Sequence, residues 1–297
     1  MNKFQIGYFA DGIWSHNALK KILKDETISI EFVCARFDRP DEELRKICIA
    51  NNIEFLVEKD INSDSFYSKV KSLGLDLLVS MSFNQIFKSR LIDLPKHGTI
   101  NCHAGKLPFY RGRNVLNWVL INDEKEFGIS VHYIDEGIDT GDLILQESFE
   151  ISENDNYKTI LEIAYKKCAE LLYLAINKIQ HFEVIRIPQN SIHPTGFYCS
   201  IRKPGDEEID WNKSSREIFN FVRALCTPGP QATTKLLDKT ISINRATLIE
   251  GAPVYKGIPG SVLGKTKLGL LVKTGDTFVE ISEFNFQGVI NIGDRLI

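Results

Sequence analysis

Several features that assign proteins to common classes are missing from this 297-residue chain. No apolar run approaches the roughly 20 residues that a membrane-spanning helix needs, which excludes a helical membrane protein. The segment 1–9 is too short for the apolar region of a secretory signal and lacks a small-residue cleavage site. The six cysteines form no C-x-x-C pair, and no histidine stands at zinc-finger spacing. We therefore expect reduced thiols, no metal site, no membrane partner and a cytoplasmic location.

Two further signatures are also lacking. The chain carries 36 Lys and Arg against 39 Asp and Glu, a net charge of −3, so it has no global basic excess of the kind that nucleic-acid-binding proteins show. The stretch from Gly7 to Gly12 is not followed by Lys-Ser or Lys-Thr, and no G-x-G-x-x-G follows a strand. No Ser or Cys beside a base indicates covalent catalysis. What remains is an ordinary folded composition with 43% hydrophobic residues.

The first 150 residues alternate strand-like and helix-like patterns. Helical spacing appears at 18–23, with Ser15 or Asn17 as the expected cap, and at 41–51. This rhythm predicts an α/β fold with a doubly wound, mainly parallel, Rossmann-like sheet that helices cover on both faces. The expected strands of this region are 4–9, 28–35, 75–80, 98–102 and, around a Gly/Asp turn, the pair 128–133 and 143–149.

The second half of the chain changes character. Residues 157–180 predict one long amphipathic helix, and 188–204 contain three prolines and few periodic apolar residues, which predicts a linker. A helix at 216–225 and short Gly-spaced strands after 241 predict a small, OB-like β-barrel. We therefore expect a catalytic domain at 1–187, a linker at 188–207 and a β-barrel domain at 208–297.

A polar cluster is predicted at the end of the 98–102 strand. Asn101 and His103 are two residues apart, so their side chains leave the strand on the same side, while Cys102 points to the opposite face and into the core. Ligands of open α/β sheets bind beyond the carboxyl ends of the strands. An amide there can donate to an oxygen that gains negative charge, and an imidazole can move protons near neutral pH. Asp139, in a Gly- and Asp-rich turn, can orient His103 or accept a proton.

Each of these signals also has a structural interpretation. An Asn-x-His pattern alone is more often structural than catalytic, and an Asp-Gly turn is more often a simple hairpin than an active site. His132 lies in the middle of a predicted strand, and we expect a structural role for it. The combination of motifs along the chain changes this balance.

Four motifs follow one another in order between residues 101 and 142. They are Asn101-x-His103, Leu107-Pro108-x-Tyr110-Arg111-Gly112-Arg113, Gly128-x-Ser130-x-His132 and Asp135-x-Gly137-x-Asp139-x-Gly141-Asp142. In this order they resemble the folate-dependent formyltransferase family, which includes enzymes acting on glycinamide ribonucleotide, on methionyl-tRNA and on sugar nucleotides. The segments 202–204, 209–211 and 218–225 resemble the entry to the second domain of the methionyl-tRNA and aminoarabinose enzymes. The resemblance therefore covers nearly the whole chain.

The resemblance implies a reaction and a co-substrate. The formyl donor would be N10-formyltetrahydrofolate and the acceptor a primary amine, with no metal. Asn101 and protonated His103 would steady the oxygen of the tetrahedral intermediate, and Asp139 would hold His103 and help to move the proton from the amine to the departing nitrogen. The resemblance places the pterin ring against the segment that follows the 75–80 strand and against the Asp-Gly loop. The residues this implies are Met81, Ser82, Phe83, Asn84, Asp135, Gly137 and Ile138.

Two departures from the family favour a nucleotide-linked amino sugar, TDP- or UDP-bound, as the acceptor. The long basic insertion of methionyl-tRNA formyltransferases is absent, because 36–40 runs straight into the acidic helix start at 41–43. The segment 116–122 closely resembles the formyltransferase half of the bifunctional aminoarabinose enzyme. Residues 208–297 hold 11 Lys and Arg against 9 Asp and Glu, a thin excess for contact with tRNA. Transfer to methionyl-tRNA is nevertheless kept as the alternative.

Five residues are candidates for contact with the substrate. Arg111 and Arg113 suit phosphate oxygens, although Arg-Gly-Arg segments are often just solvated loops. Three residues after the first strand, Tyr8, Asp11 and Trp14, suit the sugar pocket, although Trp14 also suits packing on the first helix.

Two rivals differ in chemistry. A regulatory or scaffold protein would bind folate without transferring anything, and a hydrolase would use water as the nucleophile; the three polar candidates argue against the first and the C-terminal barrel against the second. The sugar-formylating relatives imply a homodimer and a product for O-antigen or another surface glycan. The sequence does not name the sugar, the nucleotide or the position of the amine.

Overall fold

A computed structural model describes residues 3–297, and the chain separates into two compact units. The first consists of residues up to Gly112 together with Gly128–Phe149 and Ile163–Tyr198. The second combines Arg113–Phe127, Glu150–Glu162 and Cys199–Ile297. The second unit thus takes two segments from the middle of the chain. Within residues 3–297, no helix has both the length and the apolar character that crossing a bilayer requires.

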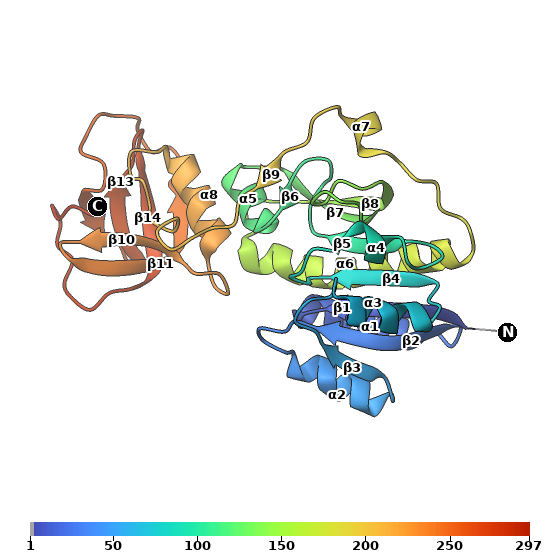
Figure 1. Cartoon of the computed structure of the whole chain (residues 1–297). Helices are drawn as coiled ribbons and strands as arrows, with labels where there is room; N and C mark the ends of the chain where they lie inside the picture. The colour runs from blue at the N-terminus through green and yellow to red at the C-terminus, as the bar shows by residue number, and fades with distance from the viewer. Residues whose placement is uncertain (1–2) are drawn as a thin grey trace. The chain divides into compact units, whose positions relative to one another are not determined.

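The first unit is built on a seven-stranded sheet of order β3-β2-β1-β4-β5-β7-β8 (Figure 1). The strands from β3 to β5 run parallel, and β7 pairs antiparallel with β5. This arrangement confirms the predicted α/β fold with a mainly parallel sheet. The strands are β1 (Phe4–Ala10), β2 (Ile28–Ala35), β3 (Glu54–Val57), β4 (Leu77–Met81), β5 (Thr99–His103), β7 (Glu126–Tyr133) and β8 (Leu143–Glu150).

Helices cover both faces of this sheet. On one face, the Tyr8 hydroxyl donates to the Ser15 carbonyl of α1, and the Cys102 thiol lies 3.6 Å from the Cys168 carbonyl of α6. On the other face, Phe9 lies in an apolar cluster with side chains of α3 and α4. The helices of this unit are α1 (Gly12–Ile22), α2 (Glu42–Ala50), α3 (Asp64–Ser72), α4 (Ser89–Ile92), the 24-residue α6 (Tyr157–Gln180), which extends into the second unit, and α7 (Gln189–Ile192).

The first helix begins earlier than the sequence predicts. Its N-cap residue is Asp11, and Ser15 is buried inside the first turns, where its hydroxyl donates to the Gly12 carbonyl. The expected caps Ser15 and Asn17 are therefore wrong. The apolar pattern that starts at Ala18 marks only the buried half of the helix, because Ile13 and Trp14 precede it on partly exposed positions.

The proline-containing segment after α6 is not a featureless connection. It contains α7 and the two-residue strand β9 (Tyr198–Cys199), which pairs with β6 (Arg111–Gly112). The Arg111 amide donates to the Phe197 carbonyl at 3.1 Å. This short pairing fixes the segment beside the loop that follows β5.

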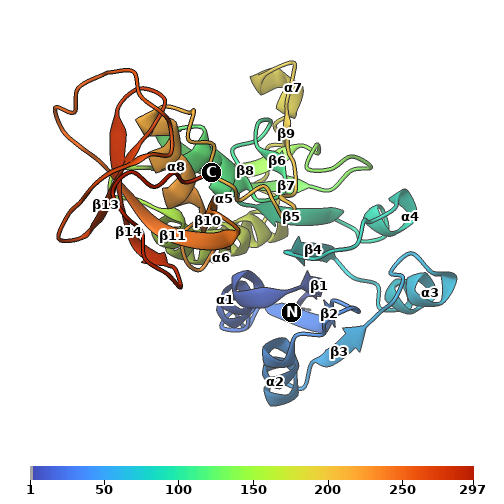
Figure 2. The same cartoon turned by 90° about the vertical axis from the view of Figure 1, so that its left-hand side faces the viewer.

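The second unit contains a five-stranded antiparallel sheet of order β10-β11-β14-β13-β12. Helix α8 lies against β11, and its buried Ile218, Val222 and Leu225 join one apolar core with the strands. Helix α5 packs beside α8, where the Asn117 amide donates to the Ala224 carbonyl at 2.6 Å (Figure 2). Its elements are α5 (Val115–Ile121), α8 (Ser215–Leu225), β10 (Ala232–Leu236), β11 (Lys239–Leu248), β12 (Val262–Lys265), β13 (Gly269–Lys273) and β14 (Phe278–Asn285).

Candidate active site

The pairing of β5 with β7 brings three polar side chains together. Asn101 lies directly opposite His132 in the antiparallel register, and directly opposed side chains share one face of a sheet. The Asn101 Nδ2 is 3.3 Å from the His132 Nε2. His103 follows two residues along β5 on the same face, and it is 9% exposed. The predicted juxtaposition of Asn101 and His103 is therefore present, and His132 is a third member.

His103 is held at both ring nitrogens. Its Nε2 lies 2.7 Å from the Tyr110 carbonyl, which only accepts, so this nitrogen carries a hydrogen. Its Nδ1 lies 3.7 Å from the Asp139 Oδ2. A Cβ at residue 105 would collide with both the His103 Nε2 and the Tyr110 carbonyl oxygen, so glycine is required where the loop folds back over the ring.

Asp139 lies at the centre of the cluster. One carboxylate oxygen accepts from the Gly112 amide at 2.9 Å, and the other lies 3.5 Å from the His132 Nε2. Burial of this side chain opposes ionisation, but the neighbouring His103 and the hydrogen bond from the Gly112 amide outweigh it, and they hold the pKa of Asp139 well below its usual range. Its backbone is left-handed, with φ +53°. The carboxylate is thus ionised between two imidazoles.

The hydrogen bonds of His132 orient Asn101. Its Nδ1 lies 2.7 Å from the Tyr133 carbonyl and so carries the hydrogen of the neutral ring, which leaves Nε2 to accept from the Asn101 amide. Asn101 uses one of its two amide hydrogens in this way and keeps the second. The sequence did not indicate this role, because His132 appears there only as a histidine in the middle of a predicted strand.

The turn that carries Asp139 is cross-linked by its own side chains. Asp135 accepts from the Gly137 amide and from the Thr140 hydroxyl. Ile138 is 52% exposed at the tip of the turn. The turn therefore presents the three predicted pterin contacts Asp135, Gly137 and Ile138 at the surface.

The segment after β4 divides its side chains between core and solvent. The Met81 side chain is buried, and the half-buried Phe83 packs its ring on Phe9 at 5.3 Å between ring centres. Ser82, with φ +62°, and Asn84 are exposed, and the Asn84 amide donates to Asp38. For Met81, contact with a ligand is left to the backbone.

The three residues predicted after β1 lie in different environments. Tyr8 has no exposed surface and donates to the Ser15 carbonyl, so its ring belongs to the core and the prediction that it lines a sugar pocket is corrected. Asp11 is nearly buried, lies 3.3 Å from the Arg36 guanidinium, and has a pKa that burial raises against the opposing charge of Arg36. Trp14 packs edge-on against Tyr165 at 4.5 Å between ring centres.

The two arginines of the Arg-Gly-Arg segment also differ. The Arg111 guanidinium donates twice to the Gln189 side chain and lies over the Tyr198 ring. Arg113 is exposed, and its backbone amide donates to the Cys199 carbonyl. Arg111 is therefore part of the folded framework, whereas Arg113 presents its side chain to solvent.

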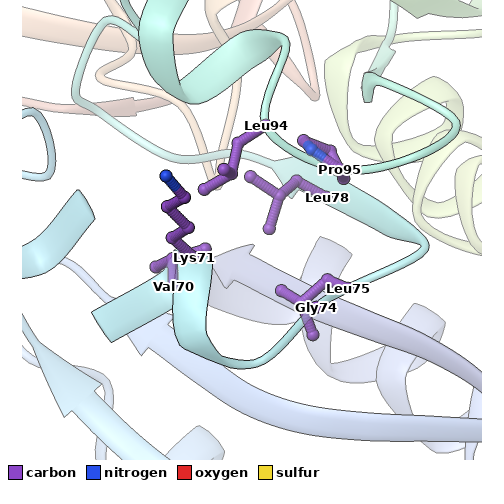
Figure 3. Close-up of a pocket in the computed structure, with 7 residues that line it drawn as sticks. All are labelled: Val70, Lys71, Gly74, Leu75, Leu78, Leu94 and Pro95. Atoms are coloured by element: carbon purple, nitrogen blue, oxygen red, sulfur yellow. The ribbon is translucent and has the colours of Figure 1, made fainter. Parts of the chain in front are cut away.

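A small pocket lies at the amino-terminal side of β4, the opposite end of this strand from Ser82 (Figure 3). Its lining is mostly aliphatic, and Lys71 is the one ionisable residue that lines it. It therefore offers no acid–base pair. Nor do residues 3–297 contain a group of three or more His, Cys, Asp or Glu arranged to hold a metal ion.

Comparison with known proteins places this cluster in a family. The model described as "Formyl transferase" matches residues 27–176, and that described as "Formyl transferase, C-terminal domain" matches 202–292. A methionyl-tRNA formyltransferase from Alkaliphilus oremlandii is 33% identical over 252 residues, which is 85% of this chain and 80% of the relative. The chain belongs to the formyltransferase family. The resemblance seen in the motifs is thereby confirmed.

Two solved structures share the fold of this formyltransferase. WlaRD, a sugar 3N-formyl transferase crystallised with dTDP and 5-N-formyl-THF, matches with a TM-score of 0.70 and 22% identity, over 97% of this chain and all of the other. The N-formyltransferase from Helicobacter canadensis, in complex with folinic acid and dTDP-3-aminofucose, matches with a TM-score of 0.68 and 22% identity, over 95% and all of the two chains. The polar cluster of this formyltransferase lies wholly within its N-terminal family match.

One further residue of the formyltransferase escaped sequence reasoning. Gln189 is 4% exposed, and its amide joins Arg111 to the Asp139 turn. It lies in the proline-containing segment that the sequence predicts to be a linker, and its partners are 48 to 78 residues away in the sequence. No local sequence pattern predicts such a contact.

Proposed function

We propose that this formyltransferase moves a formyl group from N10-formyltetrahydrofolate to the primary amine of a nucleotide-linked amino sugar. The observation that carries the proposal is the cluster of Asn101, His103 and Asp139 at the carboxyl end of β5. It combines an amide donor and an imidazole on one face of the sheet with the half-buried carboxylate of Asp139 beside them. This set suits attack of an amine on a carbonyl carbon.

The chemistry of the donor set fits the formyl-folate. Among residues 3–297, the cysteine beside the cluster is Cys102, whose thiol points to α6, so direct transfer between two bound substrates is favoured over a thiol intermediate. A bound formyl-folate supplies the one-carbon group. The backbone of Met81–Asn84 and the exposed turn of Asp135, Gly137 and Ile138 would hold its pterin ring. Two structural neighbours were crystallised with formyl-folates, which supports this assignment.

Each side chain of the cluster has its own role in the proposed reaction. The second amide hydrogen of Asn101 donates to the carbonyl oxygen as negative charge grows there. His103 adds positive charge beside it when protonated, with Asp139 stabilising the imidazolium through Nδ1. With His103 protonated, the ionised Asp139 carboxylate accepts the proton that the amine loses and gives it to the departing nitrogen, so that it is ionised again at the end of the turnover. His132 holds the Asn101 amide in position throughout.

Two observations support a sugar nucleotide as the acceptor. The connection from β2 to α2 is only Arg36 to Asp41, so it carries no basic insertion, and Arg36 itself is paired with Asp11 and Asp38. The structural neighbours with TM-scores of 0.70 and 0.68 are sugar formyltransferases, whereas that of the methionyl-tRNA formyltransferase from Clostridium thermocellum is 0.59. We assign Arg113 to the diphosphate and keep Asp11, Trp14 and Arg111 as candidate contacts.

Methionyl-tRNA is the second candidate acceptor, because the curated relatives at 33 to 34% identity are methionyl-tRNA formyltransferases. The two acceptors are separated by one assay that follows tetrahydrofolate release from N10-formyltetrahydrofolate. Parallel reactions contain TDP- and UDP-amino sugars, charged initiator methionyl-tRNA, or no acceptor. Release that depends on one amino sugar supports the proposal and names the sugar. Release that depends only on tRNA overturns it, and release without an acceptor indicates a hydrolase.

The homodimer, the cytoplasmic location and a role in the biosynthesis of O-antigen or another surface glycan stay predictions. The division into a catalytic domain at 1–187, a linker at 188–207 and a barrel domain at 208–297 is likewise proposed.

A further inference from the structure

The side chain of Gln189 uses every polar atom it has inside the first unit. Its Nε2 donates to the Asp139 carbonyl at 2.9 Å and to the Gly141 carbonyl at 2.8 Å. Its Oε1 accepts from the Arg111 Nη2 at 2.7 Å and from Nε at 3.2 Å. A glutamine amide has two hydrogens to donate and one oxygen to accept with, so this side chain is fully satisfied. It is also nearly inaccessible, at 4% exposure.

These bonds close a ring around Asp139. Gln189 binds the Asp139 carbonyl on one side and Arg111 on the other. The residue after Arg111 is Gly112, whose amide donates to the Asp139 carboxylate at 2.9 Å. One glutamine therefore fixes both the backbone of the aspartate and the strand that binds its carboxylate. Neither end of Asp139 can shift without breaking a bond in this ring.

The backbone of Asp139 needs such a restraint. Its φ of +53° is a left-handed conformation that non-glycine residues adopt at a cost, and such conformations persist where the surroundings impose them. The next glycine, Gly141, is packed so closely that a Cβ would collide with the Tyr133 carbonyl oxygen. Gln189 holds the carbonyls of both residues. The turn is therefore held in place from outside by a side chain of another segment.

We propose that Gln189 is a positioning residue of the active site, which sets the place of the Asp139 carboxylate between His103 and His132 through the Asp139 turn and Arg111. The inference rests on the proposed function, because it assigns the proton-moving role to Asp139. It gives the segment after α6 a part in catalysis that a linker would not have.

The first test replaces Gln189 by Met, which has a similar length and no hydrogen bonds to offer. With N10-formyltetrahydrofolate and the amino sugar that the acceptor assay names, kcat is expected to fall about 10- to 100-fold, because a displacement of about 1 Å of a catalytic group can have that effect. KM for the folate is expected to stay within about twofold. Asn190→Ala, an exposed neighbour in α7, is the matched control and is expected to retain wild-type turnover.

A double-variant cycle separates positioning from general stability. In an Asp139→Asn background, Gln189→Met is expected to lower the remaining kcat by less than about threefold, because the group it positions is already disabled. A loss of the same factor in both backgrounds, with a lower Tm, overturns the proposal and leaves Gln189 a structural residue. If Asp139→Asn itself turns over like the wild type, Asp139 has no proton-moving role and the proposal for Gln189 fails with it, whereas the proposed function fails only if no amino sugar supports turnover of the wild type.

A second readout needs no substrate. The carboxyl carbon of Asp139 is followed by NMR in protein labelled with 13C-aspartate and is assigned by its loss in Asp139→Asn. In the wild type, His103 from β5 and His132 from β7 face this carboxylate, and the signal is expected to stay that of the ionised form while exposed aspartates titrate. In Gln189→Met its titration is expected to move to higher pH. An unchanged titration in a folded Gln189→Met protein overturns the proposal whatever the acceptor is.

Discussion

Asp139 in the first unit and Asp123 in the second are two carboxylates with the same perturbation and different partners. The pKa of each lies well below its usual range, and for Asp123 it falls to about 2. Both carboxylates lie beside basic side chains of other elements. Judged by the direction of the pKa shift alone, either could be a catalytic group.

The partners of Asp123 are permanent cations. Arg216 donates to it through Nε at 3.1 Å and through Nη2, and the buried Arg223 approaches to 3.5 Å. Arg216 also pairs with Glu153, at 2.8 Å through Nη2. Because a guanidinium does not give up its proton in a protein, this network has one charge state over the whole physiological range.

The partners of Asp139 are groups that exchange protons. Histidine is the side chain that changes charge near neutral pH, and two of them face this carboxylate from β5 and β7. The difference teaches that a depressed carboxylate pKa does not by itself mark an active site. What makes Asp139 the candidate is that its partners belong to the class of side chain that can release and take up a proton.

The largest expected effect comes from removing the charge of Asp139, whose partners are histidines. Asp139→Asn is expected to lower kcat by about 10²- to 10⁴-fold, the usual contribution of a general acid–base group. Asparagine still accepts from the Gly112 amide but loses the charge that stabilises the carboxylate in its place, so the protein is expected to fold with a lowered Tm. Steady-state kinetics and thermal unfolding check this. Loss of less than fivefold in a folded protein would remove Asp139 from the mechanism.

A somewhat smaller effect is expected at Asn101. Asn101→Ala removes the free amide hydrogen directed at the developing oxyanion, and one such donor is worth about 10²- to 10³-fold in turnover. The measurement is kcat at saturating folate and acceptor. A raised KM with an unchanged kcat would mean that the amide binds the ground state instead.

His132 tests how far the Asn101 amide depends on its orientation. His132→Leu is expected to cost about 10-fold in kcat, because it removes the acceptor at 3.3 Å from the Asn101 Nδ2. His132→Gln supplies a new acceptor and is expected to recover part of the loss. Equal losses in the two variants would indicate a packing role.

The candidate catalytic cluster could be predicted from the sequence only in part. The two-residue spacing of Asn101 and His103 follows from strand geometry, and the family motifs implied Asp139. His132 required the register of β5 against β7, and a strand pattern does not specify which residue it will oppose. Gln189 required a tertiary contact across at least 48 residues from a segment with no regular pattern.

The fold itself was more predictable than its details. Apolar runs such as 77–79, which are buried on both faces of the sheet, predicted the central strands. The start of α1 was misplaced because its first turn is partly exposed, and Tyr8 was assigned to the pocket because strand alternation does not say which face a helix will cover. Local patterns thus identify elements, and packing decides their faces.

A substitution at Asp123, whose partners are permanent cations, is expected to lower stability and to leave catalysis unchanged. Asp123→Asn removes the charge that Arg216 and the buried Arg223 face, at an expected cost of about 1 to 2 kcal/mol in the free energy of unfolding. This is less than is usual for a buried ion pair, because the Asp123 side chain is 35% exposed. Denaturant unfolding measures the loss, and kcat is expected to stay within about twofold. A large fall in kcat without loss of stability would mean that Asp123, like Asp139, acts in catalysis.

The smallest effect is the pH dependence of that stability. Because the pKa of Asp123 is about 2 in the folded protein and about 3.9 in an unfolded chain, its contribution is complete above about pH 5 and is lost as the pH falls from about 4 to about 2. The hydrogen bond from Arg216 is the main cause of this shift. Other carboxylates titrate in the same window, so the quantity to follow is the difference in unfolding free energy between the wild type and Asp123→Asn. It is expected to be constant from pH 7 to pH 5 and to shrink toward zero below pH 4. A difference that persists at pH 2 would assign the stabilisation to hydrogen bonds that asparagine cannot replace, and the charge of Asp123 would then contribute little.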